Sequence, residues 1–453
     1  MLFREIIDSP CGIRFMADTL EMRSAAGRRL LMQSPMLESA AEIELAFAKL
    51  REFHQKLIVD QATQRRSVGR ILGIKLQGLK DCDATLRQLA AGRDGDEVCF
   101  FELKSLALLC DQISPLLLQA GITSIHLPDL QVVKELLDPD HTGIASFYIY
   151  DSYNQELGRL RQQIRSGKGD KNELLMASRM IEQQICQQLT TSIRPELEHL
   201  RTALTILAEI DLLLAKARQM ERFKLTFPSL STDEKTSYQG LFHPQVCVAL
   251  EASGKSYQPV ELTFGLMPVT VIGANMGGKT VLLRSLALSQ YLFQFGFGVP
   301  AAMATIRPIE QLYLRIGDAE ANQGGLSSFA SEITEIGTIL TAVRSCKRVL
   351  VLLDEPARTT NPVEGAALVS ALVNLLGQSG ASCVLTTHYN LLQTKSRRLK
   401  VRGLSDKGMD YTLTEVADGE VPHEALAVAR MLGVDAEWIG GAQQLLDQAI
   451  KHS

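Results

Sequence analysis

A glycine-rich loop constrains this chain more than any other stretch of its sequence. Gly273 to Thr280 reads Gly-Ala-Asn-Met-Gly-Gly-Lys-Thr and fits the pattern G-x-x-x-x-G-K-[ST]. An apolar strand pattern, Val269–Ile272, precedes the loop and a helical pattern, Val281–Gln290, follows it, which is the setting that a phosphate-binding loop requires. In such a loop backbone N–H groups surround phosphate oxygens, Lys279 reaches the β- and γ-phosphates, and the Thr280 hydroxyl ligates Mg²⁺. The sequence therefore predicts an α/β domain that binds ATP and Mg²⁺.

Length and composition indicate a soluble protein of more than one domain. The 453 residues exceed one ordinary domain, and 46% hydrophobic with 22% charged residues is typical of globular proteins. No apolar run reaches the ~18 residues of a membrane span, and no apolar signal-peptide segment follows Met1–Glu5. The eight cysteines are scattered without metal-binding spacing. We therefore expect a cytoplasmic protein with reduced thiols and no membrane partner.

The first 225 residues carry helical patterns almost throughout. Glu38–Val59 places apolar residues three and four positions apart. A second stripe, at steps close to 3.5, predicts one long packed helix. That stripe comprises Ile193, Leu197, Leu200, Leu204, Leu207 and Leu214. The glycines of Ser166–Asp170 divide two helical stretches, so residues 155–222 are predicted to form an antiparallel helical hairpin.

Three polar features have both a structural and a functional interpretation. For Asp211, which lies on the stripe, we favour capping by polar groups of a neighbouring helix over signalling to the nucleotide-binding domain. The basic tip Ser166–Asp170 is interpreted as a solvated loop, with a phosphate contact as the alternative. The basic run Lys395–Arg402 is likewise interpreted as a solvated face, with nucleic-acid phosphates as the alternative.

The region after residue 225 has the alternating pattern of an α/β domain. A linker is predicted at Phe223–Ser237, followed by strand-like segments at Val246–Leu250 and Val260–Phe264. From Val269 onward apolar strands alternate with helices, which predicts a parallel sheet with crossover helices. The last stretch, Val434–Ser453, has the pattern of an amphipathic helix that packs on the ATPase core or on a second subunit.

Two strand ends supply groups for phosphoryl chemistry. Arg348–Glu355 is a buried-strand pattern that ends in two carboxylates, and Ser382–His388 is another that ends in a histidine. Because open α/β sheets bind ligands at their strand ends, Asp354, Glu355 and His388 should converge near the loop. Asp354 suits Mg²⁺ binding, Glu355 suits orientation of the attacking water, and His388 suits sensing of the γ-phosphate. The predicted reaction is hydrolysis of ATP.

Together these segments resemble the MutS family of DNA mismatch-repair ATPases. The Asn-Met-Gly-Gly core of the loop is the most specific match. Further matching segments are Phe297–Ala301, Arg315–Gly317, Ser327–Glu332 and Thr387–Tyr389. The stretch from Asp354 to Gly365 keeps the length of the family's Asp-Glu-x-Gly-Arg-Gly-Thr segment and retains Arg358 and Thr360. Pro356-Ala357 and Thr359 replace the expected residues.

The resemblance implies a multidomain protein in which an all-α core and lever domain (1–225) precedes an α/β P-loop NTPase domain of the ABC type (226–432) and a C-terminal helical dimerisation segment (433–453). It also implies composite ATP sites in a homodimer, or in a heterodimer with a related chain. The candidate nucleotide contacts are Gly273, Ala274, Asn275, Met276, Gly277, Gly278, Lys279, Thr280, Ser327 and Ser328, of which Ser327 or Ser328 would face the partner's nucleotide. The candidate catalytic residues are Glu355, Lys279 and His388, and the candidate metal ligands are Thr280 and Asp354.

The chain also departs from the family pattern in its DNA-reading parts. It begins where the core domain would begin, so we expect the mismatch-reading and connector domains to be missing. Only about fifty residues separate Leu157 from Leu207, which is too few for the family's DNA clamp. Phe100-Phe-Glu102 repeats the Phe-x-Glu with which the family reads mismatches, but its helical setting favours core packing.

These features leave competing functions open. One is a DNA-processing ATPase without its own mismatch reader, and possible DNA binding would then lack mismatch specificity. The alternative is an ATP-dependent protein-remodelling factor, because small MutS-like chains resemble proposed reactivases of a cobalamin-dependent lysine aminomutase. The net charge of −4 favours such a protein client. A non-hydrolysing scaffold is disfavoured by the intact Lys279, Thr280, Asp354 and Glu355.

Overall fold

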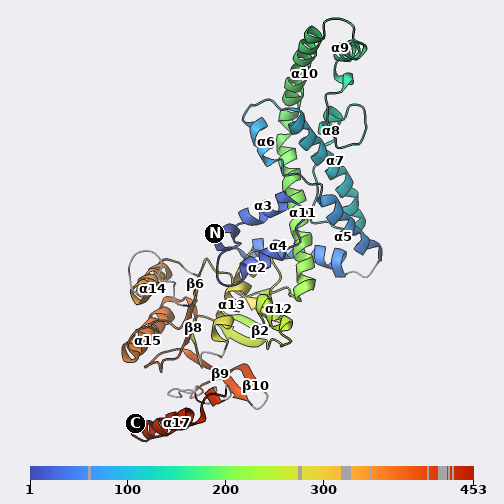
Figure 1. Ribbon diagram of the computed structural model, residues 1–453. Coiled ribbons are helices and arrows are strands. Elements are labelled where there is room, and N and C mark those ends of the chain that lie inside the picture. The colour runs from blue at the N-terminus through green and yellow to red at the C-terminus, as the bar shows by residue number, and fades with distance from the viewer. Residues whose placement is uncertain are drawn as a thin grey trace.

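Helices are the main elements in the described part of the chain that precedes the first strand (Figure 1). The computed structural model describes residues 1–59, 63–273, 278–317, 328–346, 348–405, 408–416, 426, 429–430 and 433–452. The helices of this part are α1 (Phe3–Ile6), α2 (Ile13–Asp18), α3 (Ala25–Gln33), α4 (Ala40–Phe53), α5 (Thr63–Leu76), α6 (Asp83–Ala90), α7 (Glu97–Ala120), α8 (Gln131–Leu137), α9 (Gln155–Ser166), α10 (Lys171–Ile193) and α11 (Leu197–Phe223). Shorter turns are π-helical at His54–Val59 and 3₁₀ at Asp151–Tyr153 and Arg194–Glu196.

The longest helix, α11, is the axis of this helical part. It packs against α3, α4, α5, α6 and α7, and Figure 1 shows it running from the lower end of α10 toward the strands. All six residues of the predicted stripe are buried. The prediction of a long packed helix is therefore confirmed, although a 3₁₀ turn at Pro195 separates Ile193, at the end of α10, from the rest of the stripe.

The predicted helical hairpin is present, with unequal arms. Gly167, at φ +66°, ends α9, and the Asp170 carboxylate accepts hydrogen bonds from the N–H groups of Asn172 and Glu173 to cap α10. Glycine is favoured just after the end of a helix, as at Gly167, and aspartate is favoured as the cap before a helix, as at Asp170. The returning arm is longer than α9 and continues through the 3₁₀ turn into α11.

Asp211 joins α11 to the N-terminal segment. Its carboxylate accepts from Arg23 N at 3.0 Å, Ser24 N at 2.8 Å and Ser24 Oγ at 2.6 Å. Ser24 in turn caps α3, because its Oγ accepts from Gly27 N at 3.0 Å. A buried carboxylate is tolerated when donors surround it in this way. The predicted capping role of Asp211 is confirmed.

Two sheets follow the helical part. Their strands are β1 (Ser229–Leu230), β2 (Thr236–Leu241), β3 (Val260–Phe264), β4 (Val269–Ile272), β5 (Met303–Ile306), β6 (Gln311–Arg315), β7 (Val349–Asp354), β8 (Ser382–Thr387), β9 (Arg397–Ser405) and β10 (Gly408–Glu415). The helices of this region are α12 (Pro244–Ala252), α13 (Lys279–Gln294), α14 (Ser328–Ser345), α15 (Pro362–Ser379) and α17 (Ala436–His452). The smaller sheet has the order β1-β5-β2-β3 and the larger one β10-β9-β4-β8-β7-β6.

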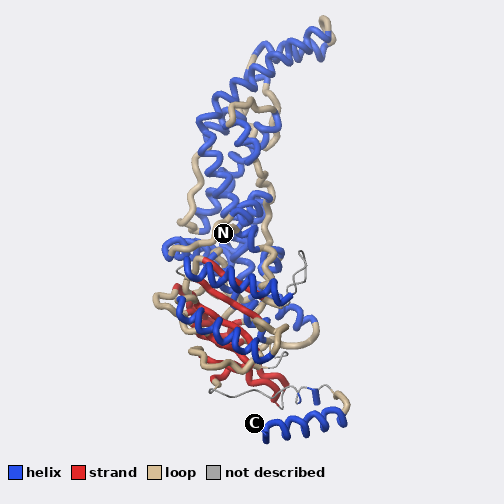
Figure 2. Tube along the Cα trace, turned by 90° about the vertical axis from the view of Figure 1, so that its left-hand side faces the viewer, coloured by secondary structure: helices blue, strands red, loops and turns tan. Residues whose placement is uncertain are grey.

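The larger sheet is covered on both faces. Its strands run parallel except for β10, which pairs antiparallel with β9. Along β7, Leu350 and Leu352 belong to the core that includes α13, whereas Val349, Val351 and Leu353 pack with α14 and α15. Figure 2 shows helices lying across the sheet below the elongated helical part. The predicted parallel sheet with crossover helices is therefore present.

One predicted strand is wrong. Val246–Leu250 lies in helix α12, whereas Val260–Phe264 is strand β3 as predicted. A short apolar run fits a strand or a buried helix equally well, and here Pro244 occupies the first turn of the helix, where its missing N–H costs nothing. The predicted linker Phe223–Ser237 also contains β1 and the start of β2.

All eight cysteines are free thiols, as predicted. The amphipathic helix predicted near the C-terminus is α17, which leaves Trp438 and Leu445 68% and 69% exposed. None of the helices in the described ranges is long and apolar enough to cross a membrane.

Lys216 links the helical part to the larger sheet. Its Nζ, on α11, donates to the carbonyl oxygens of Phe295 at 2.7 Å and Gly296 at 3.2 Å, just beyond α13, and lies 4.1 Å from the Phe297 ring centroid. Complete burial lowers the pKa of this lysine to about 7, although Glu209 raises it slightly. The junction between the two parts thus contains an amine that titrates near neutral pH.

We predict that Lys216→Met reduces the pH dependence of stability. The folded pKa is near 7 and the ordinary value is 10.5, so between these pH values the unfolded chain binds more protons and the stability of the native protein rises with pH. The slope from one such group is at most about 1.4 kcal/mol per pH unit. Urea unfolding at pH 7 and pH 9 measures the difference. The exposed Lys75→Met is the control, and an unchanged slope in Lys216→Met would contradict the burial effect.

Candidate functional site

Parallel pairing brings three strand ends to one edge of the larger sheet. Ile272 of β4 pairs with Thr387 of β8, and Asp354 of β7 pairs with Thr386 of β8. The residues that follow these strands therefore lie side by side, and α13 begins at Lys279 above them. The structure brings Lys279 together with Glu355, and Thr280 together with Asp354. Ala274–Gly277 and Ser327 lie outside the described residues, as does the side chain of Ser328.

Lys279 and Glu355 form a buried ion pair. Lys279 Nζ lies 2.9 Å from Glu355 Oε1, with side-chain exposures of 3% and 10%, and it also donates to the Gly273 carbonyl at 2.6 Å. Burial raises the pKa of Glu355. The hydrogen bond from Lys279 and the nearby positive charges lower it by more than burial raises it, so the net pKa falls below its usual range. Glu355 is therefore an ionised carboxylate beside a lysine ammonium.

Thr280 and Asp354 form a second pair next to the first. Thr280 Oγ1 donates to Asp354 Oδ2 at 2.6 Å, and Thr386 Oγ1 donates to Asp354 Oδ1 at 2.6 Å. A hydroxyl and a carboxylate at hydrogen-bond distance suit Mg²⁺, which prefers oxygen ligands and is held by few protein groups together with phosphates and water. In the described part of the chain, no group of three or more His, Cys, Asp or Glu side chains is placed to hold a metal by itself.

The turn after β7 has an unusual backbone. Glu355 has φ +46° and Ala357 has φ +61°, and for residues other than glycine the left-handed region costs about 1–2 kcal/mol each. Glu355 N donates to the Thr386 carbonyl at 3.1 Å and to Thr386 Oγ1 at 3.0 Å. Backbone strain of this kind persists only where surrounding contacts hold it.

His388 lies at the end of β8 and its side chain is exposed. Desolvation lowers its pKa, Glu355 raises it, and Lys279 and Arg358 lower it again, with a net decrease. The ring is therefore neutral at pH 7. The charges of Glu355, Lys279 and Arg358 thus act on the pKa of the His388 ring.

A cavity of about 130 Å³ lies over these side chains. Its lining consists of Lys279, Thr280, Arg315, Gly317, Glu332, Asp354, Glu355 and Arg358. Arg358 Nη1 lies 3.5 Å from Glu355 Oε2, and Arg315 Nη1 donates to Glu332 Oε1 at 2.8 Å. Such a small, strongly charged cavity suits phosphate oxygens and a metal ion.

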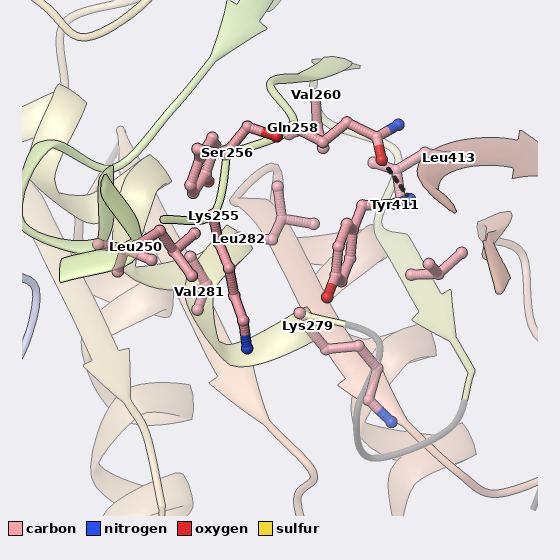
Figure 3. Close-up of a pocket in the computed structure, with 14 residues that line it drawn as sticks. Leu250, Lys255, Ser256, Gln258, Val260, Lys279, Val281, Leu282, Tyr411 and Leu413 are labelled. Carbon is pink, nitrogen blue, oxygen red and sulfur yellow. Dashed lines mark hydrogen bonds between the residues drawn. The ribbon is translucent and has the colours of Figure 1, made fainter. Parts of the chain in front are cut away.

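A second cavity, of about 290 Å³, lies on the other side of the start of α13 (Figure 3). Figure 3 shows Tyr411 on one side of it and Leu250 and Lys255 on the other. Gly278 is needed here, because a Cβ would lie 3.1 Å from the Tyr411 ring and φ is +69°. Gln258 fixes the wall, since its Oε1 accepts from Tyr411 N at 3.0 Å and its Nε2 donates to Asp410 at 2.9 Å.

This second cavity was missed by the sequence analysis. Its walls come from α12, the segment before β3, the start of α13, β9 and β10. Most lining groups are apolar or aromatic, which suits the base of a nucleotide. No local motif marks these residues, so only their packing around the start of α13 brings them together.

Two segments had competing interpretations in the sequence, and the structure shows the contacts that each one makes. Phe100 is buried, and Glu102 accepts from Thr85 Oγ1 at 2.5 Å, so the predicted core packing of Phe100-Phe-Glu102 is confirmed. The basic run lies largely in β9, where Arg397 pairs with Glu415 at 2.7 Å and Arg402 with Asp410 at 3.1 Å. Two of its cations, Arg397 and Arg402, are therefore paired with carboxylates of β10.

Strand, loop and helix, with a lysine and paired carboxylates at the strand ends, define a nucleotide-binding domain of the P-loop class. Residues 269–449 match the family described as MutS domain V. The chain is 28% identical over 285 residues to a protein named Endonuclease MutS2 from Leuconostoc citreum, covering 61% of this chain and 35% of the relative. The match to MutS domain V thus covers residues 269–449, which include Lys279, Thr280, Asp354 and Glu355.

Other relatives carry the same name. The Pediococcus pentosaceus protein is 30% identical over 275 residues, covering 59% of this chain and 34% of the relative. The Streptococcus pneumoniae protein is 27% identical over 304 residues, covering 65% and 37%. The chain thus spans about a third of the length of these curated relatives.

Proposed function

We propose that this protein hydrolyses ATP with Mg²⁺ in its MutS domain V. The observation that carries this proposal is the pairing of Lys279 with Glu355 beside the pairing of Thr280 with Asp354 in one charged cavity. Phosphoryl transfer to water needs a phosphate cradle, a metal site and a group that orients the water, and these four residues supply candidates for each. The second cavity would hold the base, with Tyr411 against it.

Binding of the nucleotide rearranges the Lys279 pair in this proposal. A buried lysine left without a counter-ion is costly, by roughly 3–5 kcal/mol, so its ammonium leaves Glu355 only when phosphate oxygens replace the carboxylate. Glu355 is then free to accept a hydrogen bond from the attacking water. Thr280 and Asp354 would hold Mg²⁺, which when bound neutralises charge on the phosphate oxygens. We propose that His388, which follows β8, responds to the γ-phosphate.

Two substitutions separate binding from turnover. Lys279→Ala should weaken ATP binding, because it removes the ammonium that contacts phosphate. Glu355→Ala should leave ATP bound but lower kcat by at least about a hundredfold, because the water loses its orienting base. Calorimetric titration and phosphate release measure the two effects. The exposed Glu364→Gln on α15 is the control, and full turnover by Glu355→Ala would remove Glu355 from the mechanism.

We further propose that turnover requires a dimer, either of two copies or with a related chain. Ser328 begins α14, and Glu332 of this helix lines the charged cavity. The segment Ser327–Glu332, which by the family resemblance would face the partner's nucleotide, is thus connected to the site through α14. α17 carries the exposed Trp438 and Leu445, an apolar surface of the kind found at subunit interfaces.

The dimer proposal predicts that specific ATPase activity rises with protein concentration. Light scattering with and without ATP measures the mass over the same range. Trp438→Ser should shift both the mass and the activity curve to higher concentration, because it removes apolar area from the contact. A monomer that hydrolyses ATP at a concentration-independent rate would refute the proposal.

For the client, we propose that the protein acts on DNA without reading mismatches. The family assignment supports DNA. Against mismatch reading, Phe100 is buried and cannot insert between bases, an insertion that must offset an unstacking cost of a few kcal/mol. The competing candidate is a protein client, such as a cobalamin-dependent aminomutase. It is favoured by the pairing of Arg397 and Arg402 within the β9–β10 hairpin.

A titration with matched and mismatched duplexes at two salt concentrations distinguishes these candidates. We expect affinities that differ by less than tenfold between the duplexes, or about 1.4 kcal/mol, and that fall steeply with salt because phosphate contacts dominate. DNA should also stimulate ATP hydrolysis. A larger mismatch preference would overturn the proposal, whereas no DNA binding with intact hydrolysis would favour the protein client.

A further inference from the structure

The turn that carries Glu355 contains a residue in a conformation that its side chain disfavours. Ala357 stands where the family's Asp-Glu-x-Gly segment has its glycine, and its φ is +61°. Glycine adopts positive φ freely, whereas alanine does not. Something other than local preference must therefore hold this turn, which lies two residues beyond the carboxylate assigned to the attacking water.

Two side chains from different elements hold both backbone polar groups of Ala357. Glu332 Oε1, on α14, accepts from Ala357 N at 2.9 Å. Tyr389 Oη, from the segment after β8, donates to the Ala357 carbonyl at 2.7 Å. Pro356 has no N–H, so the N–H of Ala357 is the first backbone donor after Glu355. The two peptide groups that flank the Ala357 Cα are thus each held by one side chain.

Each of these two side chains is itself fixed. Glu332 is buried and also accepts from Arg315 Nη1 at 2.8 Å. Tyr389 is buried against α15, where a Cβ at Gly365 would lie 2.5 Å from its ring, and its backbone N–H donates to Thr387 Oγ1 at 3.0 Å. The positions of Glu332 and Tyr389 are therefore set by the fold, independently of the turn that they hold.

We propose that Glu332 and Tyr389 are positioning residues for Glu355, which hold Ala357 in the left-handed conformation and so fix where the Glu355 carboxylate points. The proposal rests on the ATPase function proposed above. Glu332 lies on α14, which begins at Ser328, and Tyr389 follows His388. Their contacts with Ala357 therefore connect the turn to the two segments, Ser327–Glu332 and Thr387–Tyr389, to which the family resemblance gives roles at the nucleotide. A displacement of either segment would move Glu355.

Tyr389→Phe is the sharpest test, because it removes only the hydroxyl and keeps the ring against Gly365. We expect kcat to fall by about ten- to a hundredfold, as misplacement of a reacting group does, while KM for ATP stays within about twofold. Glu332→Ala should behave alike. Glu332→Gln should retain part of the activity, since its amide oxygen can still accept from Ala357 N.

Two further variants separate positioning from general damage. Glu335→Gln is the matched control, because Glu335 binds the same guanidinium, 3.1 Å from Arg315 Nε, without contacting Ala357 in the described hydrogen bonds; its kcat should match that of the native protein. Ala357→Gly in the Tyr389→Phe background should restore much of the lost kcat, because glycine holds positive φ unaided.

Hydrogen exchange in the nucleotide-free protein provides a readout that does not depend on activity. The Ala357 amide should exchange faster in Glu332→Ala and Tyr389→Phe than in the native protein and in Glu335→Gln. Native kcat and native exchange in Tyr389→Phe would overturn the inference and leave the ATPase proposal standing. If the native protein hydrolyses no ATP, the proposed function is refuted instead. If amide exchange of Ala357 is also unchanged in both Glu332→Ala and Tyr389→Phe, the inference that these side chains hold the turn is refuted as well.

Discussion

The parallel pairing of β4, β8 and β7 is the constraint on which the nucleotide site depends. Because neighbouring parallel strands end at the same edge, the loop after β4, the carboxylates at the end of β7 and the histidine after β8 must meet. The register decides which of these groups meet directly, since Asp354 pairs with Thr386 and receives its hydroxyl hydrogen bond. The chemistry of the site is therefore a property of the sheet as much as of its motifs.

Buried charge is accommodated by dedicated partners in both parts of the molecule. In the site, Lys279 is matched by Glu355 and Asp354 by two hydroxyls. In the helical part, Asp211 is surrounded by donors from the N-terminal segment, and Lys216 of the same helix reaches carbonyls beyond α13. One helix, α11, thus carries a polar contact toward the helical core and another toward the nucleotide-binding domain.

Much of the site was predictable, because its residues lie in short motifs with strict spacing. The P-loop, the carboxylate pair and the strand-end histidine each follow an apolar strand, so pattern and chemistry pointed to the same place. The second cavity was not predictable, since its lining residues, among them Gln258 and Tyr411, come from separate segments. The helix α12 was mistaken for a strand for a related reason. A five-residue apolar run has no period long enough to distinguish the two structures.

The residue types and spacings of Lys279-Thr280 and Asp354-Glu355 were enough to predict phosphate and metal binding, because these are the groups that a phosphate and a metal require. The sequence by itself also determined the long buried helix α11, through a stripe whose period is a local property of the chain. The contacts of Glu332 and Tyr389 with Ala357 depend on tertiary structure instead, since they join segments that are distant along the chain. The conformation of Ala357 opposes its own local preference, and a local preference is all that a sequence pattern records.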